Sequence, residues 1–187
     1  MRKKPSATLL KSLAIGVAAT SISACDDSEE VEVVTSILDC VDDTVMSVEQ
    51  CRTAYQNALN ESERIGPKYP TEDGCESEFG DGQCRRNSFG SFTPIMVGYL
   101  FANNLWDDNN SRYGASFNPV YRYFRPFSSL HNRLVTADGQ LIGEDADNKF
   151  KLKKKSLKKK PTVSKTVSRG GFGSTARSKS SRSSWGG

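Results

Sequence analysis

The sequence has a single histidine among its 187 residues and lacks the short motifs that mark common catalytic and nucleotide-binding sites. It contains no G-x-x-x-x-G-K-S/T, H-E-x-x-H or G-x-S-x-G pattern. A Ser-His-Asp or Cys-His site would have to use His131, which lies in the polar stretch SSLHNRL without a nucleophile signature beside it. We therefore expect His131 to be an exposed loop residue. The protein is predicted not to be an enzyme, with no catalytic residue and no cofactor.

Acidic residues are absent from both ends of the chain, although the whole sequence has a net charge of only +4. Residues 1–24 carry four bases and residues 149–187 carry thirteen, and neither segment has an acid. All 22 acids lie in residues 25–148, which have a net charge of −13. The chain is therefore predicted to have an acidic body and a basic tail.

No apolar run reaches the ~20 residues that a membrane-spanning helix needs. The N-terminus instead has a basic head, a short apolar stretch and then small residues, which is the order of a secretory signal peptide. Its last four residues, Ile22-Ser23-Ala24-Cys25, resemble the bacterial lipobox. Residues 1–24 are therefore expected to be removed and Cys25 to be acylated, for example with palmitate. Cleavage after Ala24 by an ordinary signal peptidase, leaving a free or disulfide-bonded cysteine, is the alternative.

Asp26 and Asp27 follow this cysteine directly. In enteric bacteria the arrangement resembles that of lipoproteins kept in the inner membrane, which predicts the periplasmic face of the inner membrane, with the outer membrane as the alternative. The two aspartates also begin an acidic linker, predicted over residues 25–38. Acyl chains gain about 0.8 kcal/mol per buried CH₂ group, so several chains together hold a protein stably on a membrane.

The remaining cysteines contain no C-x-x-C pair, and all four lie within 45 residues: Cys40, Cys51, Cys75 and Cys84. An even number of cysteines in an exported chain predicts two disulfides, in any of three pairings. A zinc site is the alternative, but His131 is distant in sequence, and no metal site is expected.

Local signals predict helices around these cysteines. A capping box at Ser47–Gln50 starts a helix that ends before Gly66, and Thr71 caps a shorter helix that ends at Gly80. Two short helices have too little core to be stable alone, so disulfides are expected to hold them together. The predicted unit is a disulfide-stapled helical module over residues 39–106.

The most hydrophobic part of the chain after the N-terminus is Phe89–Trp106. From Pro94 it is predicted to be a short helix that packs as core or lies in a membrane interface. Residues 107–148 then interleave arginines with aromatic residues, which indicates either an irregular strand or a surface that stacks on sugar rings or bases. A β-hairpin with its turn at Asp138-Gly139 is predicted near the end of this segment.

Residues 149–187 have too few apolar side chains to fold alone, so this tail is predicted to be disordered. The fold class is therefore predicted to be mainly α: a small disulfide-stapled helical module with a minor β-hairpin and a long disordered basic tail. Near an anionic leaflet each lysine is worth about 1 kcal/mol, so the lysines of the tail are candidates for contact with an anionic surface. These candidates are Lys151, Lys153, Lys154, Lys155, Lys158, Lys159 and Lys160.

Three stretches of the sequence carry a family resemblance. They are CRTAYQNALNESERIGPKYPTEDGCESEFGDGQC from Cys51 to Cys84, GSFTPIMVGY from Gly90 to Tyr99, and TVSRGGFG from Thr166 to Gly173. These stretches resemble the YgiB family of uncharacterised enterobacterial lipoproteins, and the resemblance implies no catalytic residue. Genes of that family often neighbour one for an ATP-grasp ligase resembling glutathionylspermidine synthase. This implies, as an alternative function, an accessory protein or one that binds a small polyamine-like ligand.

Taken together, the sequence predicts a non-enzymatic cell-envelope lipoprotein of unknown specific role. It is expected to be tethered to a membrane by acylated Cys25 and to contact an anionic membrane, another envelope surface or a protein partner through its cationic tail. A nucleic-acid-binding protein that uses the same tail is a further alternative, which the signal peptide disfavours. No oligomeric state follows from the sequence.

Overall fold

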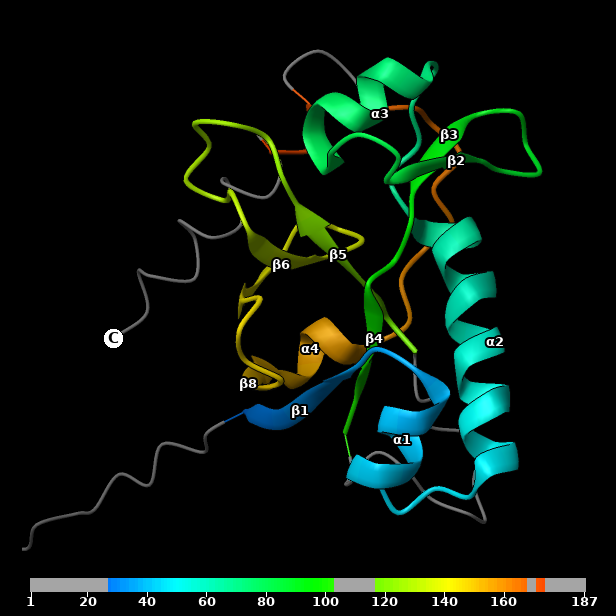
Figure 1. Ribbon diagram of the computed structural model, residues 1–187, viewed down its shortest axis with the longest axis vertical. Coiled ribbons are helices and arrows are strands. Elements are labelled where there is room, and N and C mark those ends of the chain that lie inside the picture. Colours follow the sequence, from blue (N-terminus) through cyan, green and yellow to red (C-terminus); the bar gives the residue numbers. More distant parts are fainter. Residues whose placement is uncertain (1–26, 103–116, 168–170, 174–187) are drawn as a thin grey trace, which may run out of the picture.

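The computed structural model describes residues 27–102, 117–167 and 171–173, and the fold is mainly β. Its strands are β1 (Ser28–Val34), β2 (Cys84–Arg86), β3 (Phe92–Pro94), β4 (Gly98–Phe101), β5 (Pro119–Tyr123), β6 (Arg133–Thr136), β7 (Leu141–Glu144) and β8 (Lys149–Lys153). Its helices are α1 (Ile37–Asp43), α2 (Val48–Ile65), α3 (Glu72–Phe79) and α4 (Lys154–Leu157). Six strands form an antiparallel sheet in the order β7-β6-β5-β4-β1-β8, and β2 pairs with β3 in a second sheet (Figure 1).

The first and last strands of the described chain lie side by side. β1 pairs with β8 so that Glu30 lies opposite Lys151 and Glu32 lies opposite Lys149. Opposite charges at facing positions stabilise an antiparallel pair of strands. On its other side β1 pairs with β4, so the strand at the start of the described chain is an inner strand of the sheet.

Strands β6 and β7 form the predicted hairpin around Asp138 and Gly139. From this hairpin the sheet curls back, and β7 approaches β8 to give a nearly closed barrel. The ring of Phe150 on β8 lies against Gly143 of β7, where an added β-carbon would be 2.3 Å from Cε1 of that ring. A larger residue at position 143 would therefore push the two edges of the sheet apart.

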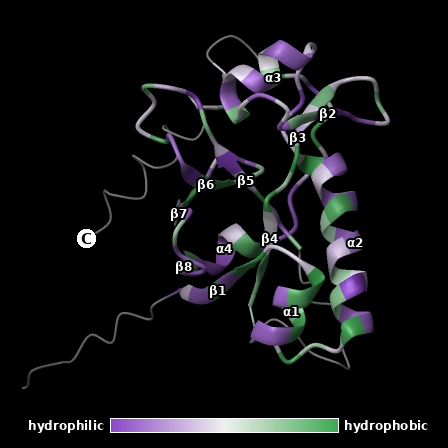
Figure 2. Ribbon diagram, in the orientation of Figure 1, coloured by the Kyte–Doolittle hydropathy of each residue, from purple (hydrophilic) through white to green (hydrophobic). Residues whose placement is uncertain are grey.

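Helices α2 and α3 form where the local signals predicted them. Ser47 Oγ accepts from the backbone N of Gln50, and the Gln50 side chain accepts from the backbone N of Ser47. The buried residues of α2 recur every three or four positions from Cys51 to Ile65, on the face that packs against the sheet (Figure 2). Thr71 caps the first turn of α3. Both predicted helices and their caps are confirmed.

Two disulfides hold the helices to their neighbours. Cys40–Cys51 joins α1 to α2, and Cys75–Cys84 joins α3 to β2. The prediction of two disulfides is confirmed, and of the three pairings that the sequence left open the structure has the one between sequence neighbours. Each bridge closes a short loop and is expected to add about 2–4 kcal/mol of stability.

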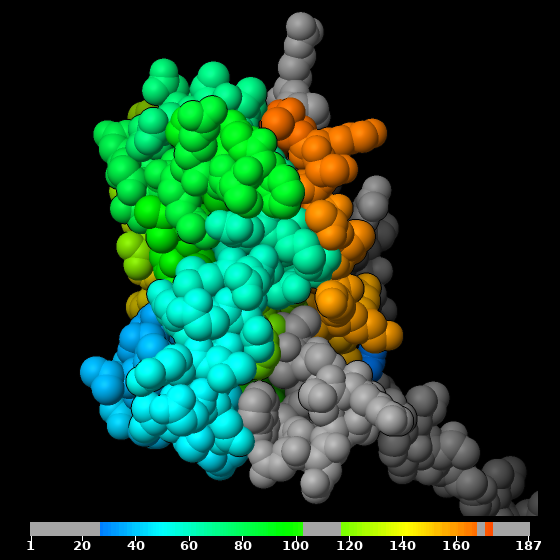
Figure 3. Space-filling model, turned by 90° about the vertical axis from the view of Figure 1, so that its right-hand side faces the viewer, coloured from blue at the N-terminus to red at the C-terminus, as the bar shows by residue number. Residues whose placement is uncertain are grey.

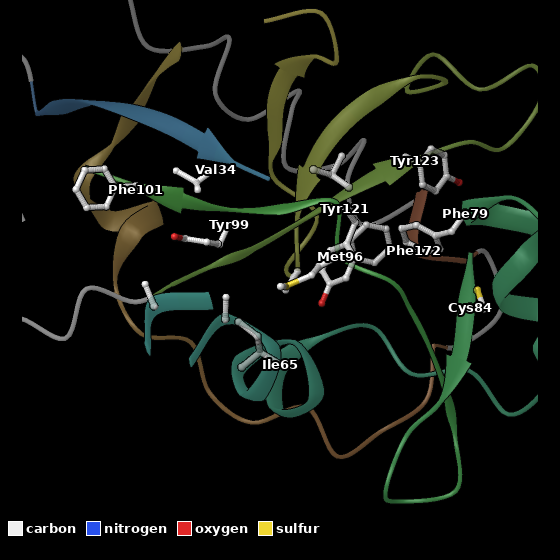
Figure 4. Close-up of a cluster of buried hydrophobic side chains, with 14 of the residues drawn as sticks. Val34, Ile65, Phe79, Cys84, Met96, Tyr99, Phe101, Tyr121, Tyr123 and Phe172 are labelled. Carbon is white, nitrogen blue, oxygen red and sulfur yellow. The ribbon is translucent and has the colours of Figure 1, made fainter. Parts of the chain in front are cut away.

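Apolar side chains pack on both faces of the central sheet. One cluster lies between the sheet and α1–α3 and includes Tyr99, Tyr121 and Ile65 (Figure 4). The other lies inside the curl of the sheet and includes Leu100 and Leu157. The neighbours Tyr99 and Leu100 therefore belong to different clusters, because successive side chains of a strand point to opposite faces.

The prediction of a mainly α fold was wrong, because pairings between distant segments decide the fold. Residues 28–34, predicted as part of an acidic linker, form β1 opposite the lysines of β8. A helix was predicted from Pro94, but Pro94 ends β3 and residues 98–101 form β4, since β1 and β5 provide hydrogen-bonding partners on both sides of β4. The end of that predicted helix, residues 103–106, lies outside the described residues.

The prediction of a disordered tail was also wrong where the structure describes that tail. Residues 149–157 form β8 and α4, and residues 158–167 continue as a strip beside α2, which we call the strap (Figure 3). Backbone N–H groups of the strap donate to the carbonyl oxygens of Arg64 and Lys68, at 3.0 and 2.7 Å. The tail has too few apolar residues for a core of its own, but those few add to the core of the body.

Candidate functional site

The lysines predicted to contact an anionic surface fall into two groups in the structure. Five are exposed where β8 leads into α4 and the strap, and we call them the basic end: Lys153, Lys154, Lys155, Lys158 and Lys159. The other two lie near acidic residues of the body, although Lys151 is exposed as well. Lys151 lies opposite Glu30 in the β1–β8 pair, and Lys160 Nζ lies 3.2 Å from Asp138 Oδ2.

Acidic side chains neutralise little of the basic end. Within the described residues, its ion pair joins Lys154 Nζ to Glu29 Oε2 at 4.0 Å, and 53% of the Lys154 side chain remains exposed. Exposed ion pairs contribute about 0–1 kcal/mol. The positive charge of the basic end is therefore available to a partner outside the molecule.

The start of the described chain lies at the basic end (Figure 1). The backbone N of Lys154 donates to the carbonyl oxygen of Asp27 at 2.9 Å. Cys25 and Asp26 lie outside the described residues, but two residues of fully extended chain span only about 7 Å. The predicted acylation site is therefore never farther than this from a residue that is hydrogen-bonded to the basic end.

The buried glutamates of β1 are part of the body and not of the exposed surface. Burial raises the pKa of Glu32 above the ordinary value of 4.5, and Lys149 opposes this rise while Asp43 and Glu30 add to it. Asn148 Nδ2 donates to Glu32 Oε1 at 3.3 Å. Burial thus makes ionisation of Glu32 less favourable in the folded state, which makes the stability of the protein sensitive to pH.

A second polar arrangement lies away from the basic end, at the end of the molecule that α3 forms, around the carboxylate of Glu78 (Figure 1). Its Oε2 accepts from Tyr69 Oη at 2.6 Å and from the backbone N of Phe172 at 2.7 Å. Its Oε1 lies 3.5 Å from Arg125 Nη1, and only 4% of the Glu78 side chain is exposed. Burial and the hydrogen bond to Glu78 raise the pKa of Tyr69, so its phenol remains a donor.

The donor from Phe172 belongs to a short part of the tail, Gly171–Gly173, which we call the docked segment. The ring of Phe172 is buried with the rings of Phe79 and Tyr123, at centroid distances of 5.5 and 6.4 Å (Figure 4). A β-carbon on either flanking glycine would come within 2.1 Å of the side chain of Glu78 or Tyr123. A residue larger than glycine at position 171 or 173 would therefore require the side chain of Glu78 or Tyr123 to move.

Neither Glu78 nor Phe172 was predicted to belong to a site. The stretch TVSRGGFG carried only the family resemblance, and the whole tail was predicted to be disordered. The missed signal is one aromatic residue between glycines in an otherwise polar tail. Glu78 gives no local signal, because it is one of many acids in an acidic body.

Groups with other possible chemistry are separate from both arrangements. His131 lies in a turn before β6, with Nδ1 3.0 Å from the carbonyl oxygen of Phe124. Across the ranges that the structure describes, no three His, Cys, Asp or Glu side chains are grouped so that they could hold a metal ion. None of the helices in those ranges is both long and apolar enough to cross a membrane.

Comparison with known proteins places the chain in a family. A family model described as "Protein of unknown function (DUF1190)" matches residues 28–185. The chain belongs to the DUF1190 family. A UPF0441 protein of Klebsiella pneumoniae subsp. pneumoniae is 31% identical, in an alignment that covers 96% of this chain and 86% of the relative. A UPF0441 protein of Pectobacterium atrosepticum is 30% identical, with 86% and 77% covered.

The DUF1190 match includes every strand and helix described above, since it begins at Ser28, the first residue of β1. It therefore includes the basic end, Glu78 and the docked segment. The predicted membership of an uncharacterised enterobacterial family is confirmed, and the match is consistent with the YgiB family. No solved structure matches this DUF1190 chain.

Proposed function

We propose that this DUF1190 protein is a non-enzymatic cell-envelope lipoprotein whose basic end lies on an anionic surface, next to an acylated Cys25. One observation carries the proposal: the 2.9 Å hydrogen bond from Lys154 N to Asp27 O. It holds the exposed lysines beside the chain that leads to Cys25. The acyl chains and the lysines then act on the same leaflet of the same membrane.

The physics of membrane attachment favours such a combination. A single acyl chain binds only reversibly, and stable anchoring takes a second signal such as more acyl chains or a basic patch. Each lysine near an anionic leaflet adds about 1 kcal/mol, and this attraction falls off within a Debye length of about 8 Å at physiological salt. Lysines must therefore be close to the leaflet to contribute. Those of the basic end lie beside the chain that leads to the proposed anchor, which would keep them near the leaflet.

The periplasmic face of the inner membrane is the location that we propose. Asp26 and Asp27 after the cysteine support retention there. Disulfides persist in oxidising compartments such as the periplasm, so the Cys40–Cys51 and Cys75–Cys84 bridges support an exported protein. An anionic phospholipid leaflet is then the nearest surface to the basic end.

The first test is intact mass and membrane fractionation of the wild type beside Cys25→Ala, both expressed in a Gram-negative host. We expect the wild type to lack residues 1–24, to carry lipid and to sediment with the inner membrane. The variant should lose the lipid mass. Retention of residues 1–24 on a cytosolic protein would overturn the proposal, and the tail should then be tested against RNA.

The second test isolates the lysines. In the unacylated chain, Lys153→Gln, Lys154→Gln and Lys155→Gln together should lower the affinity for vesicles containing anionic lipid roughly 100-fold, from about 1 kcal/mol per lysine. The matched control removes three bases elsewhere, with Arg52→Gln, Arg86→Gln and Lys165→Gln. Equal losses in the two triple variants would mean that net charge acts alone and that the basic end is not the contact.

A further inference from the structure

A groove of about 570 Å³ opens at the α3 end of the molecule. Phe79 of α3 lines it together with Ile95, Phe124 and Pro126 from the segments that follow β3 and β5. Ile95 and Phe124 are 42% and 43% exposed. Large apolar side chains that stay half-exposed around one hollow are typical of a surface that another group covers.

The charges that line the groove favour a cationic occupant. Glu76 and Asp81 belong to its lining. The positive charge there, that of Arg122, is already paired with Asp145 through a 2.6 Å contact from Nη2 to Oδ2. An occupant with both an apolar group and positive charge would therefore match the groove.

The chain contains a segment of this kind directly after the docked segment. Residues 174–187, which lie outside the described residues, have no acidic side chain. They carry Arg177, Lys179, Arg182 and Trp185. Phe172 packs on the ring of Phe79, which also lines the groove, so residues 174–187 begin close to it. The twelve residues from Ser174 to Trp185 can span about 40 Å when extended, which is long enough to reach the groove from Gly173.

We propose that the groove binds the C-terminal residues of its own chain, with the indole of Trp185 on the apolar lining and the bases of residues 177–182 beside Glu76 and Asp81. The volume of the groove falls within the ~300–1,000 Å³ typical of pockets that enclose a compact ligand. An indole combines a large apolar surface with one N–H donor, which suits a lining of apolar and carboxylate groups. This site is at the far end from the basic end and is independent of the proposed membrane function.

Tryptophan fluorescence of the full chain tests the proposal directly. The sequence has two tryptophans, so Trp106→Phe leaves Trp185 as the sole emitter. We expect a blue-shifted emission maximum and weak quenching by acrylamide. Adding Ile95→Lys and Phe124→Lys, which make the groove polar and cationic, should shift the emission to the red and raise the quenching constant several-fold.

Two further variants make the result specific. Leu38→Lys with Val45→Lys changes apolar residues that are 75% and 79% exposed and do not line the groove, and it should leave Trp185 shielded. If the groove double variant does not fold, the single surface change Asp81→Lys replaces it and should raise quenching, more so at low salt. Equal quenching of Trp185 with intact and altered grooves overturns the proposal. Shielding that disappears on dilution overturns it too, since the occupant would then come from a second copy.

Discussion

Glu78 keeps its carboxylate in the interior because donors from several parts of the chain converge on it. They are the phenols of Tyr69 and Tyr123, the guanidinium of Arg125 and the backbone N–H of Phe172. A buried polar group that loses a partner costs about 1–3 kcal/mol, and more when it is charged. Glu78 therefore makes the body depend on the docked segment, in addition to the apolar contacts of Phe172.

The glycine before Phe172 gives the first prediction at the scale of single residues. Gly171→Ala should release the docked segment, because a β-carbon there would lie 1.8 Å from Glu78 Oε1. Faster hydrogen exchange of the Phe172 amide and a lower free energy of unfolding are the expected results. Both can be measured on the full chain by exchange mass spectrometry and by denaturant unfolding.

Gly90→Ala is the matched control for this change. Gly90 also has a positive φ, +82° against +70° at Gly171, but nothing lies within 4 Å of its added β-carbon. Both variants therefore carry the backbone cost of about 1–2 kcal/mol that alanine has in this region. If Gly171→Ala costs no more than Gly90→Ala, the contact with Glu78 does not hold the docked segment.

Glu32 gives a prediction about pH. Its raised pKa means that the folded state binds the proton more tightly than the unfolded chain does. The wild type therefore loses stability as the pH rises from below 4.5 through the raised value, and the loss persists at neutral pH. Glu32→Gln removes this loss and keeps an oxygen that can accept from Asn148, so it should be the more stable protein at neutral pH.

Urea unfolding midpoints at neutral pH and well below the ordinary glutamate pKa would measure this difference. The gain of Glu32→Gln over the wild type should appear only in the neutral series. Glu30→Gln removes an exposed charge of the same strand that only adds to the rise in the Glu32 pKa, so it should give a smaller gain. The same gain at both pH values would mean that the change acts through packing and not through ionisation.

At the scale of elements, the sequence predicted what local signals encode. The caps at Ser47 and Thr71, the helices behind them and the hairpin at Asp138 all depend on residues within a few positions of one another. Strands β1 and β8 do not, because each is stabilised by a partner at the other end of the chain. SEEVEVV and KFKLK alternate charged and apolar residues, a pattern typical of half-buried strands that the linker and tail predictions overlooked. Their opposite charges, taken together, indicate that the two strands pair.

The candidate site, like the fold, could be predicted only where the signal is local in the sequence. The lysines could be identified as a candidate surface because they form a run in the sequence. Their separation into an exposed basic end and the pair Lys151 and Lys160 depends on Glu30 and Asp138, which only the fold brings near. The docked segment could not be predicted, since its site combines α3, β5 and the tail.

The strand order of the sheet predicts how C-terminal truncation will affect the stability of the fold. A chain ended after Val167 should still fold, with a loss of about 3–5 kcal/mol, the usual cost of removing a buried phenylalanine side chain. The donor that Glu78 loses adds to this cost. A chain ended after Asn148 should show no cooperative unfolding, because it lacks β8 and α4 and leaves one edge of β1 and the inner core uncovered. Circular dichroism during thermal or urea unfolding measures both effects.

A chain ended after Gly173 is the reference, because it keeps the docked segment. It should unfold cooperatively and be more stable than the chain ended after Val167. A cooperative transition in the chain ended after Asn148 would show that β8 is dispensable, contrary to the pairing of β1 with both β4 and β8.

At the scale of the whole molecule, α3 lies at one end, and the basic end lies in the other half, beside β1 (Figure 1). If the basic end rests on a membrane, α3 and the groove beside it point away from that membrane. A fluorophore at Asp27→Cys should then be quenched by lipid-borne quenchers in anionic vesicles several-fold more than one at Asp73→Cys. The two positions are matched, since both are exposed aspartates and neither change removes a lysine.

Equal quenching at the two positions would mean that the molecule lies on its side or binds through another face. The same pair of labels on vesicles without anionic lipid gives the baseline. With those vesicles, the lipid-borne quenchers should quench neither label on the unacylated chain, because the attraction of the lysines is electrostatic.

The pairing of β1 with β8 also sets the order of events when the protein is made. Residues 28–34 are synthesised long before residues 149–153, the strand that becomes their neighbour. Pairings between distant segments form late, since a long loop must close before they stabilise anything. The six-stranded sheet therefore cannot be completed until β8 is available, and before that the chain can still be threaded through a narrow pore. The same delay leaves its edges exposed to other chains, so a newly made molecule depends on being completed quickly.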